Sequence, residues 1–278
     1  MNETQAVEVR EDAPVQIASV NVNGIRAAFR RGMGPWLEER APDVLLLQEV
    51  RAPDDLLADF LPGDTWHVAH SEATAKGRAG VAVASRLPVS AVRIGLDQGV
   101  PTNTGRWIES DLEMADGSRL TVVSAYIHSG TENTPSMDEK YAFLSLVTDR
   151  MAELLASGRH AVVGGDLNIA HRDQDLKNWR GNRGKAGCLP EERAWMDRWF
   201  DAGWVDVARR LAGPDEPGPY TWWSYRGKAF DTDTGWRIDY QVATPGLAEL
   251  ATSADVDRAA TYDARFSDHA PLVMSYNL

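Results

Sequence analysis

The segment Trp107–Ile127 reads WIESDLEMADGSRLTVVSAYI and predicts two β-strands joined by a tight turn. The two runs Trp107–Met114 and Arg119–Ile127 flank Asp116-Gly117, a pair of residues typical of a short hairpin loop. Strands joined in this way are antiparallel, whereas parallel strands need long crossover connections. The segment therefore favours two β-sheets packed face to face, with helices outside, over the alternative of a doubly wound parallel sheet.

Further strand-like runs and three helical segments lie on both sides of this hairpin. The other predicted strands are Val15–Val20, Val44–Gln48, Gly80–Ala84, Val89–Ile94, Ala161–Gly164, Arg237–Ala243 and Pro271–Tyr276. The predicted helices are Ala27–Arg40, Met137–Ala156 and Pro190–Phe200. Since helices occur in both halves of the chain, the predicted fold class is α/β.

The composition is that of a globular protein without disulfides. The 278 residues allow one large domain or two small ones, and the net charge of −12 argues against indiscriminate binding to polyanions. Cys188 is the only cysteine, which fits a reducing, cytoplasmic compartment. No apolar run reaches the roughly 18 residues of a transmembrane helix, so we expect no membrane partner. We expect residues 1–14 to be a disordered acidic tail and residues 15–278 to form a single catalytic domain.

The stretch Leu176–Gly187, LKNWRGNRGKAG, is basic although the chain as a whole is acidic. A basic, glycine-rich loop in an acidic protein is typical of an arm that contacts phosphates. A solvated surface loop is the alternative, and charge alone does not distinguish the two. The cationic side chains of this stretch are Lys177, Arg180, Arg183 and Lys185.

Polar side chains recur at the ends of the apolar runs. The runs with their polar ends are Ile17–Asn23, Val44–Glu49, Val122–Tyr126, Ala161–Asn168, Arg237–Asp239 and Ser267–His269. Buried ionisable groups are costly unless they are paired or bound to a metal. We therefore expect these side chains to gather at one edge of the sheets, as in a hydrolytic metal site.

Taken singly, each polar end is open to a functional and a purely structural interpretation. In Gly164–Asn168, GGDLN, the Asp166 carboxylate can orient or deprotonate water and the Asn168 amide can donate to a phosphoryl oxygen. An Asx turn that closes a strand is the alternative. Glu49 is either a metal ligand or the cap of a surface strand.

The other polar ends are equally ambiguous. Asn21 and Asn23 alternate onto one face of an extended segment, or they form a turn before a helix. The Asp268-His269 pair combines a metal-binding or water-orienting carboxylate with an imidazole that can contact phosphate. Asp239 can hold His269 in one tautomer and orientation, or it is a paired structural carboxylate.

The aromatic stretch Tyr220–Tyr225, YTWWSY, is followed closely by Trp236. Tryptophan and tyrosine at this density usually build core. They can also line a pocket for a sugar or stack on a base. We expect core for most of them and a pocket for one or two.

Nine stretches in this order resemble the exonuclease III / AP endonuclease family. They are NVNGIRA, LQEV, GVAVAS, AYIHSG, GGDLNIAH, LPEERAWMD, YTWWSYR, GWRIDY and SDHAPL, and they extend over nearly the whole chain after the tail. The resemblance implies a four-layer αββα sandwich of two packed mixed β-sheets flanked by helices. It also implies a hydrolase that needs a divalent metal, normally Mg²⁺ with Mn²⁺ as a substitute. His128-Ser129 departs from the family pattern, which usually has proline and then Asn or Gln after the tyrosine.

The resemblance also assigns roles to individual residues. It implies that the amides of Asn21 and Asn168 contact the scissile phosphate and that Asp166 positions or deprotonates the attacking water. It also implies that His269, with Asp239 as its partner, binds the phosphate and that Tyr126 lies near the phosphate. The metal contacts are Glu49, with Asn23 and Asp268 as secondary contacts. The pocket for a base-less sugar is lined by Trp222, Trp236 and Ile238. The DNA-binding residues are Arg26, Arg51, Asn178, Asn182, Arg183 and Lys185.

The implied function is a DNA-repair phosphodiesterase that cleaves duplex DNA 5′ of abasic sites and also acts on 3′ ends as an exonuclease and end-cleaning enzyme. We expect a cytoplasmic monomer whose partner is double-stranded DNA with abasic sites or 3′ ends. One alternative is a phosphodiesterase of the same superfamily that acts on lipid or inositol phosphates. A non-catalytic DNA-binding protein is the other, and the complete set of catalytic side chains argues against it.

Overall fold

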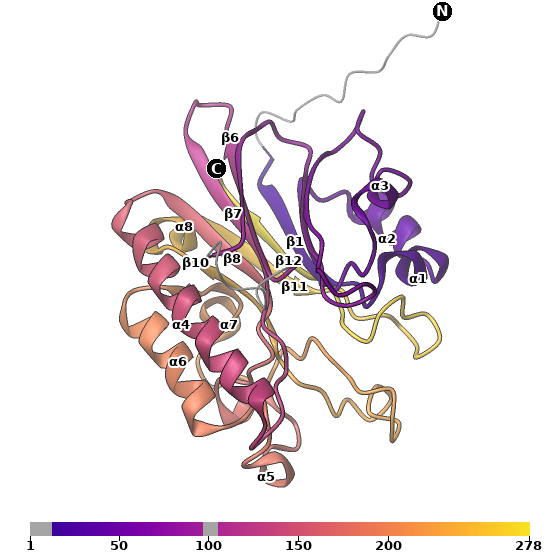
Figure 1. The fold of residues 1–278 in the computed structure, drawn as a ribbon, viewed down its shortest axis with the longest axis vertical. Coiled ribbons are helices and arrows are strands. Elements are labelled where there is room, and N and C mark those ends of the chain that lie inside the picture. The colour runs from indigo at the N-terminus through magenta and orange to yellow at the C-terminus, as the bar shows by residue number, and fades with distance from the viewer. Residues whose placement is uncertain (1–12, 97–104) are drawn as a thin grey trace, which may run out of the picture.

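Two six-stranded β-sheets pack face to face between layers of helices (Figure 1). The structure, a computed structural model, describes residues 13–96 and 105–278, so most of the predicted acidic tail lies outside the described residues. The predicted αββα sandwich is confirmed, and the doubly wound parallel sheet is wrong. Among the described residues, no helix combines the length and the apolar character needed to cross a bilayer.

Both sheets are mixed, with one parallel pair each, β1/β2 and β7/β8. The first sheet has the order β11 (Ala251–Val256), β12 (Leu272–Tyr276), β1 (Val15–Asn21), β2 (Val44–Gln48), β4 (Val81–Ser85) and β3 (His67–Ser71). The second has the order β5 (Val89–Ile94), β6 (Trp107–Glu113), β7 (Arg119–Tyr126), β8 (His160–Asp166), β10 (Asp239–Ala243) and β9 (Val205–Asp206).

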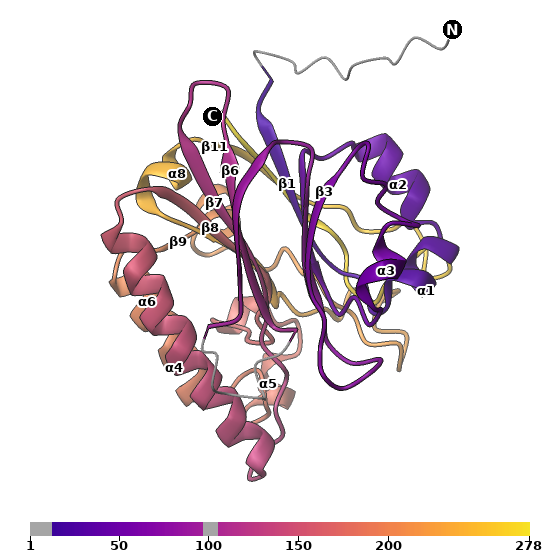
Figure 2. The same cartoon turned by 45° about the horizontal axis from the view of Figure 1, so that its top comes forward.

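The helices cover the outer faces of the two sheets. Figure 2 shows α4 and α6 side by side on one side of the sandwich and α1, α2 and α3 on the other. The helices are α1 (Ile25–Arg30), α2 (Met33–Arg40), α3 (Asp54–Leu57), α4 (Pro135–Ala156), α5 (Trp179–Asn182), α6 (Pro190–Asp201), α7 (Val207–Ala212) and α8 (Pro245–Glu249). A short 3₁₀ turn, Asp173–Asp175, precedes α5.

The predicted hairpin forms as expected. Strands β6 and β7 pair antiparallel from Trp107↔Ala125 to Glu113↔Arg119. The turn between them has Gly117 at φ 82°, and Asp116 accepts a hydrogen bond from the Ser118 amide at 2.8 Å. A positive φ is favourable for glycine, which explains why the sequence signal is specific.

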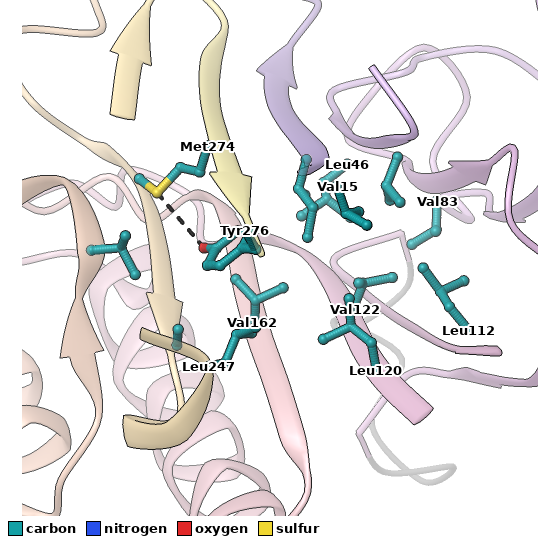
Figure 3. Close-up of a cluster of buried hydrophobic side chains, with 14 of the residues drawn as sticks. Val15, Leu46, Val83, Leu112, Leu120, Val122, Val162, Leu247, Met274 and Tyr276 are labelled. Carbon is teal, nitrogen blue, oxygen red and sulfur yellow. Dashed lines mark hydrogen bonds between the residues drawn. The ribbon is translucent and has the colours of Figure 1, made fainter. Parts of the chain in front are cut away.

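In the central strands of both sheets, residues alternate between two apolar layers, so these strands have no polar face. On β1, Ile17 faces the core between the sheets, whereas Ala18 packs under the helices of the first sheet. Figure 3 shows the inter-sheet core, in which Leu46, Val122 and Val162 come from both sheets. Burial on both faces explains why the strands read as continuous apolar runs rather than as an alternating pattern.

Two sequence predictions need correction. The single helix predicted for Ala27–Arg40 is two helices, α1 and α2, because Gly32 adopts a left-handed φ of 111° and breaks the helix. Strands β3, β9 and β11 were not predicted, since half-exposed, short or polar strands give a weak apolar signal.

The topology brings one edge of each sheet together. The parallel strands β1 and β2 end side by side, as do β7 and β8, where Tyr126 pairs with Asp166. Strands β10 and β12 run antiparallel to β8 and β1, so they begin at the edge where those strands end. The segment around α5 and the loops before β10 and β12 project from this same end of the sandwich (Figure 1).

Candidate active site

The polar strand ends predicted from the sequence meet at this edge. One part of the prediction is wrong in detail, because Asp239 and His269 do not end strands. Asp239 is the first residue of β10 and pairs with Asp166, and His269 lies just before β12. Antiparallel pairing reverses these strands, so a residue at their start reaches the same edge as a residue at the end of β8.

Asp166 lies at the centre of the polar side chains at this edge. It is 1% exposed, and its Oδ2 accepts hydrogen bonds from the amide groups of Asn21 and Asn168, each at 2.9 Å. Its Oδ1 accepts from the Asn168 backbone amide at 3.0 Å. Burial raises the pKa of Asp166 to about 8, with Asp239 and Glu49 adding to the effect and His269 opposing it. The carboxyl group can therefore take up a proton near neutral pH.

The imidazole of His269 lies between two carboxylates. Its Nδ1 is 2.8 Å from Asp239 Oδ2, and its Nε2 is 3.8 Å from Asp166 Oδ2. Burial alone would lower the pKa of His269, but the neighbouring carboxylates, Asp239 first, outweigh it and raise the pKa to about 10. An imidazolium held in this way presents an N–H at Nε2 to an anion.

Asp268 and Asn23 form a second polar pair beside His269. Asp268 Oδ1 accepts from the Asn23 amide at 2.8 Å, and its Oδ2 accepts from the Trp222 indole at 3.1 Å. Burial would raise the pKa of Asp268, but His269 and these two donors lower it below its usual value. Asp268 is therefore an ionised carboxylate at neutral pH.

Glu49 follows β2 and shares a donor with Asp166. The same Asn21 amide nitrogen that binds Asp166 also donates to Glu49 Oε1 at 2.9 Å. Tyr126 lies close by, and burial together with the Glu49 carboxylate raises the pKa of its phenol. Glu49 is thereby connected to the Asp166 cluster through one amide.

Four residues assigned to this site adopt a left-handed backbone although none is glycine. The φ angles of Asn23, Glu49, Arg51 and Asn168 are 46°, 49°, 52° and 50°. Such conformations are uncommon for side-chain-bearing residues and cluster at functional sites. Their concentration where strands end is an independent sign that this edge is built for binding or chemistry.

The aromatic residues predicted to line a pocket stand next to His269. The rings of Trp222 and Trp236 meet edge to face with centroids 6.1 Å apart, and the Trp222 ring is 6.4 Å from the imidazole. Both indoles are half-buried, whereas Ile238 is buried at 5% exposure. The two tryptophans therefore offer an apolar wall directly beside the polar cluster.

The residues predicted to bind DNA form two separate groups. Arg26 and Arg51 line a pocket of about 500 Å³ formed by the start of α1, the segment before α3 and the loop before β4. The other group lies on the loop around α5, where Arg180 and Arg183 stack on the Trp179 ring at 4.3 and 4.5 Å. In that loop Asn178, Arg183 and Lys185 are exposed and Asn182 is half-buried, donating to the Asn178 carbonyl at 2.8 Å.

Sequence reasoning missed two features of this region. Lys76 and Arg78 line the same pocket as Arg26, and the basic glycine-containing stretch Lys76–Arg78 was the signal for them. Lys140 is completely buried on α4 and donates to the Asn168 carbonyl at 3.0 Å and to Glu192 at 2.5 Å. A lysine within the apolar stripe of a helix was the signal for this contact.

The donor groups at this edge fit a divalent cation. Within the described residues, Asp166, Asp239 and His269 have ligand atoms within 4.8 Å of one another, and Asp239 Oδ1 is buried without a hydrogen-bond partner. The raised pKa of His269 favours the imidazolium form, which cannot bind a cation. Glu49 and the ionised Asp268 offer the oxygen atoms that hard cations prefer.

Comparison with known proteins identifies the family. The model of the Endonuclease/Exonuclease/phosphatase family matches residues 18–269. The chain belongs to this family. It is 33% identical to an exodeoxyribonuclease of Bacillus subtilis over 265 residues, which cover 95% of this chain and all of the relative. The predicted resemblance to exonuclease III and AP endonucleases is confirmed.

Two solved structures share the fold over the same extent. An AP endonuclease from Archaeoglobus fulgidus superposes with a TM-score of 0.82 at 30% identity. A 3′-5′ exonuclease from Neisseria meningitidis superposes with a TM-score of 0.83 at 28% identity. In both cases the match covers 95% of this chain and all of the other chain.

Proposed function

We propose that the chain is a metal-dependent DNA-repair phosphodiesterase that incises duplex DNA 5′ of abasic sites and also processes 3′ ends. The observation that carries this proposal is the convergence of Asp166, Asp239 and His269 with the Asn21 and Asn168 amides beside a tryptophan wall. The names of the relatives, exodeoxyribonuclease and AP endonuclease, support the same substrate class. Since all these groups come from one chain, we propose that it acts as a monomer. We also propose that it acts in the cytoplasm.

The polar cluster can bind and polarise a phosphodiester. His269, held through Nδ1 by Asp239, donates from Nε2 to a non-bridging phosphate oxygen. The side-chain amides of Asn21 and Asn168 both donate to Asp166 Oδ2. Turned to a bound phosphodiester, these amides would stabilise the charge that develops on the phosphoryl group. These donors are preorganised, because Asp166 and neighbouring backbone groups already hold them.

Asp166 is the candidate to activate the attacking water. Its pKa of about 8 makes it a stronger base than an ordinary carboxylate, and it lies 3.8 Å from His269 Nε2. Water oriented by Asp166 attacks phosphorus on the side opposite the leaving 3′ oxygen. The proton moves to Asp166, the bond between phosphorus and the 3′ oxygen breaks, and the leaving oxygen takes a proton from solvent water. The incision leaves a 3′ hydroxyl and a 5′ phosphate on the abasic sugar.

Glu49, with Asn23 and Asp268 as secondary contacts, would hold the cation. We propose Mg²⁺, with Mn²⁺ as a substitute, because the ligand atoms are oxygens. Mg²⁺ keeps several of its waters when bound, so a single direct carboxylate ligand from the protein is enough. When bound, such an ion neutralises charge on the phosphoryl and leaving oxygens.

Specificity for an abasic site would come from the tryptophan wall beside His269. A sugar without a base would pack next to Trp222 and Trp236, whereas a full nucleotide would be too large to fit there. A missing base also lowers the cost of turning the sugar out of the helix. Arg26 and Arg51 on one flank and the α5 loop on the other would grip the flanking phosphates.

A panel of substrates tests this proposal. Purified protein with Mg²⁺ is assayed on a duplex with one abasic analogue, on recessed 3′ ends, on 3′-phosphate ends, and on sphingomyelin and an inositol phosphate. We expect incision of the abasic duplex, some activity at 3′ ends, and none on the lipid or inositol substrates. Hydrolysis of the latter without nicking of DNA would favour the alternative considered from the sequence.

A further inference from the structure

Both oxygens of the Glu49 carboxylate are engaged, and they have very different partners. Oε1 accepts from the buried Asn21 amide at 2.9 Å, whereas Oε2 is paired with the Arg51 guanidinium. The Glu49 side chain is 13% exposed and that of Arg51 is 38% exposed. The guanidinium is therefore the more exposed partner and lies on the solvent side of the carboxylate.

The backbone beneath this ion pair is fixed. The Val50 amide donates to Gly80 at 3.0 Å and the Arg51 amide donates to Ala79 at 2.9 Å. On the other side, the Ile25 amide donates to the Val50 carbonyl at 3.1 Å. Because the turn is held from two directions, any rearrangement here is confined to the Arg51 side chain.

Arg51 also faces a second, anion-attracting environment. It lines the pocket of about 500 Å³ together with Arg26, Lys76 and Arg78, against a single acidic residue, Glu72. A concave surface with this excess of cations attracts phosphate. Arg51 thus stands between a carboxylate on one side and a phosphate-binding pocket on the other.

An arginine cannot serve both partners at once. A divalent cation bound to Glu49 needs the oxygen that Arg51 occupies and repels the guanidinium. Exchange is inexpensive, since an ion pair this close to solvent contributes little to stability. In the pocket, the released guanidinium can form bidentate hydrogen bonds with a phosphate.

We propose that Arg51 is an exchangeable counter-ion: it covers Glu49 when the cation is absent and turns to a DNA phosphate in the adjoining pocket when the cation binds. Metal binding and DNA binding are thereby coupled, and the coupling is reciprocal, because each ligand favours the same position of Arg51. The DNA half of this inference rests on the proposed function, whereas the metal half does not.

The first test measures cation binding without DNA and without turnover. Mn²⁺ is titrated into wild-type protein, Arg51→Gln and Arg26→Gln, and free Mn²⁺ is followed by electron paramagnetic resonance. Arg51→Gln removes the competitor and should bind Mn²⁺ about two- to five-fold more tightly, the range of an exposed ion pair. Arg26→Gln removes the same charge from the same pocket and should stay close to wild type. Unchanged or weaker Mn²⁺ binding by Arg51→Gln, or an equal gain in both variants, would overturn the proposal.

The second test measures the coupling itself. Binding of a duplex with an abasic analogue and an uncleavable phosphorothioate linkage is compared with and without Mg²⁺. Mg²⁺ should tighten DNA binding by wild-type protein, and this gain should shrink in Arg51→Gln but persist in Arg26→Gln. An equal Mg²⁺ effect in wild type and Arg51→Gln would refute the coupling. Failure of wild-type protein to incise DNA would refute the proposed function and leave the Mn²⁺ result to decide the counter-ion role.

Discussion

At the scale of single residues, the chemistry of the site depends on the hydrogen bonds and charges that surround the Asp166 carboxyl group. Three donors from Asn21 and Asn168 hold this buried carboxyl, and His269 faces it at 3.8 Å. Donors stabilise the charged form of a carboxyl, whereas burial and the carboxylates nearby favour the protonated form. The balance leaves a pKa of about 8, which suits a group that takes a proton from water.

Replacing Asp166 tests its role as a base. Asp166→Asn keeps the size and the polar contacts of the side chain but cannot accept a proton. We expect the single-turnover incision rate to fall by about 10²- to 10⁴-fold, with only a modest loss of DNA affinity. The control is Asp263→Asn, a charge change on an exposed loop. Incision by Asp166→Asn at the wild-type rate would remove Asp166 from the proton-transfer step.

The same cluster makes the stability of the metal-free protein depend on pH. The pKa of His269 rises from 6.5 to about 10, so its contribution is fully present below pH 6.5 and is lost as pH rises toward 10. The pKa of Asp166 rises from 3.8 to about 8, so folding is favoured at low pH and weakened across that window. Both groups act in the same direction. In EDTA, the unfolding temperature should fall between pH 6.5 and 10, and His269→Gln should flatten this decline. A steeper decline in the variant would contradict the assignment.

At the scale of elements, the loop around α5 is organised by one tryptophan. The guanidinium groups of Arg180 and Arg183 both stack on the Trp179 ring, which holds two cations on an exposed arm. Glu192 holds the base of this arm, accepting from the Gly187 amide at 2.7 Å while it pairs with Lys140. The basic stretch is thus an ordered, exposed segment, which is compatible with an arm that contacts phosphates and with a solvated surface loop.

The salt dependence of DNA binding tests whether the arm contacts DNA. If Arg183 contacts a phosphate, Arg183→Ala should weaken DNA binding and reduce the slope of log affinity against log salt by about 1. Arg119→Ala is the matched control, since this exposed arginine starts β7 at the opposite edge of the sheet. An unchanged salt slope in Arg183→Ala would mean that the arm faces away from DNA.

The sequence predicted the elements that are apolar on both faces, and it predicted the residues at their ends. The hairpin of β6 and β7 and the helices α4 and α6 follow from turn chemistry and periodicity, which are local signals. The break at Gly32 could not be seen, because isolated glycines occur within helices as well. The recurrence of polar ends on apolar runs predicted that these side chains gather at one edge. The contact of Asn21 with Asp166, which lie 145 residues apart, depends on strand order and register, which no local pattern gives.

At the scale of the whole molecule, β8 packs so closely against its neighbours that two of its positions admit no side chain. Gly165 has φ 153°, and a Cβ there would overlap the Ala125 carbonyl oxygen of β7, the adjacent strand of the same sheet. At Gly164 a Cβ would overlap Leu46 of β2, which belongs to the opposite sheet. Both glycines directly precede Asp166, so the packing of β8 and the position of the site are linked.

A methyl group at Gly165 therefore tests the packing that positions the site. We expect Gly165→Ala to lower the free energy of unfolding by about 1–3 kcal/mol or more, since β7 and β8 cannot move apart without weakening their own pairing. Incision should fall as well, because Asp166 is the next residue. Gly63→Ala is the control, as nothing lies within 4 Å of a Cβ at that position. Wild-type stability of Gly165→Ala in urea denaturation would contradict the close approach.

The measurement that bears most directly on the whole account is single-turnover incision of a duplex with one abasic analogue, by wild-type protein and His269→Ala, in Mg²⁺ and in EDTA. We predict a cut directly 5′ of the abasic residue by wild-type protein in Mg²⁺. We expect a rate at least about 100-fold lower after chelation or in His269→Ala. Wild-type protein that leaves the duplex intact, or His269→Ala that cuts it at the wild-type rate, would contradict the claim that these strand ends form one catalytic site.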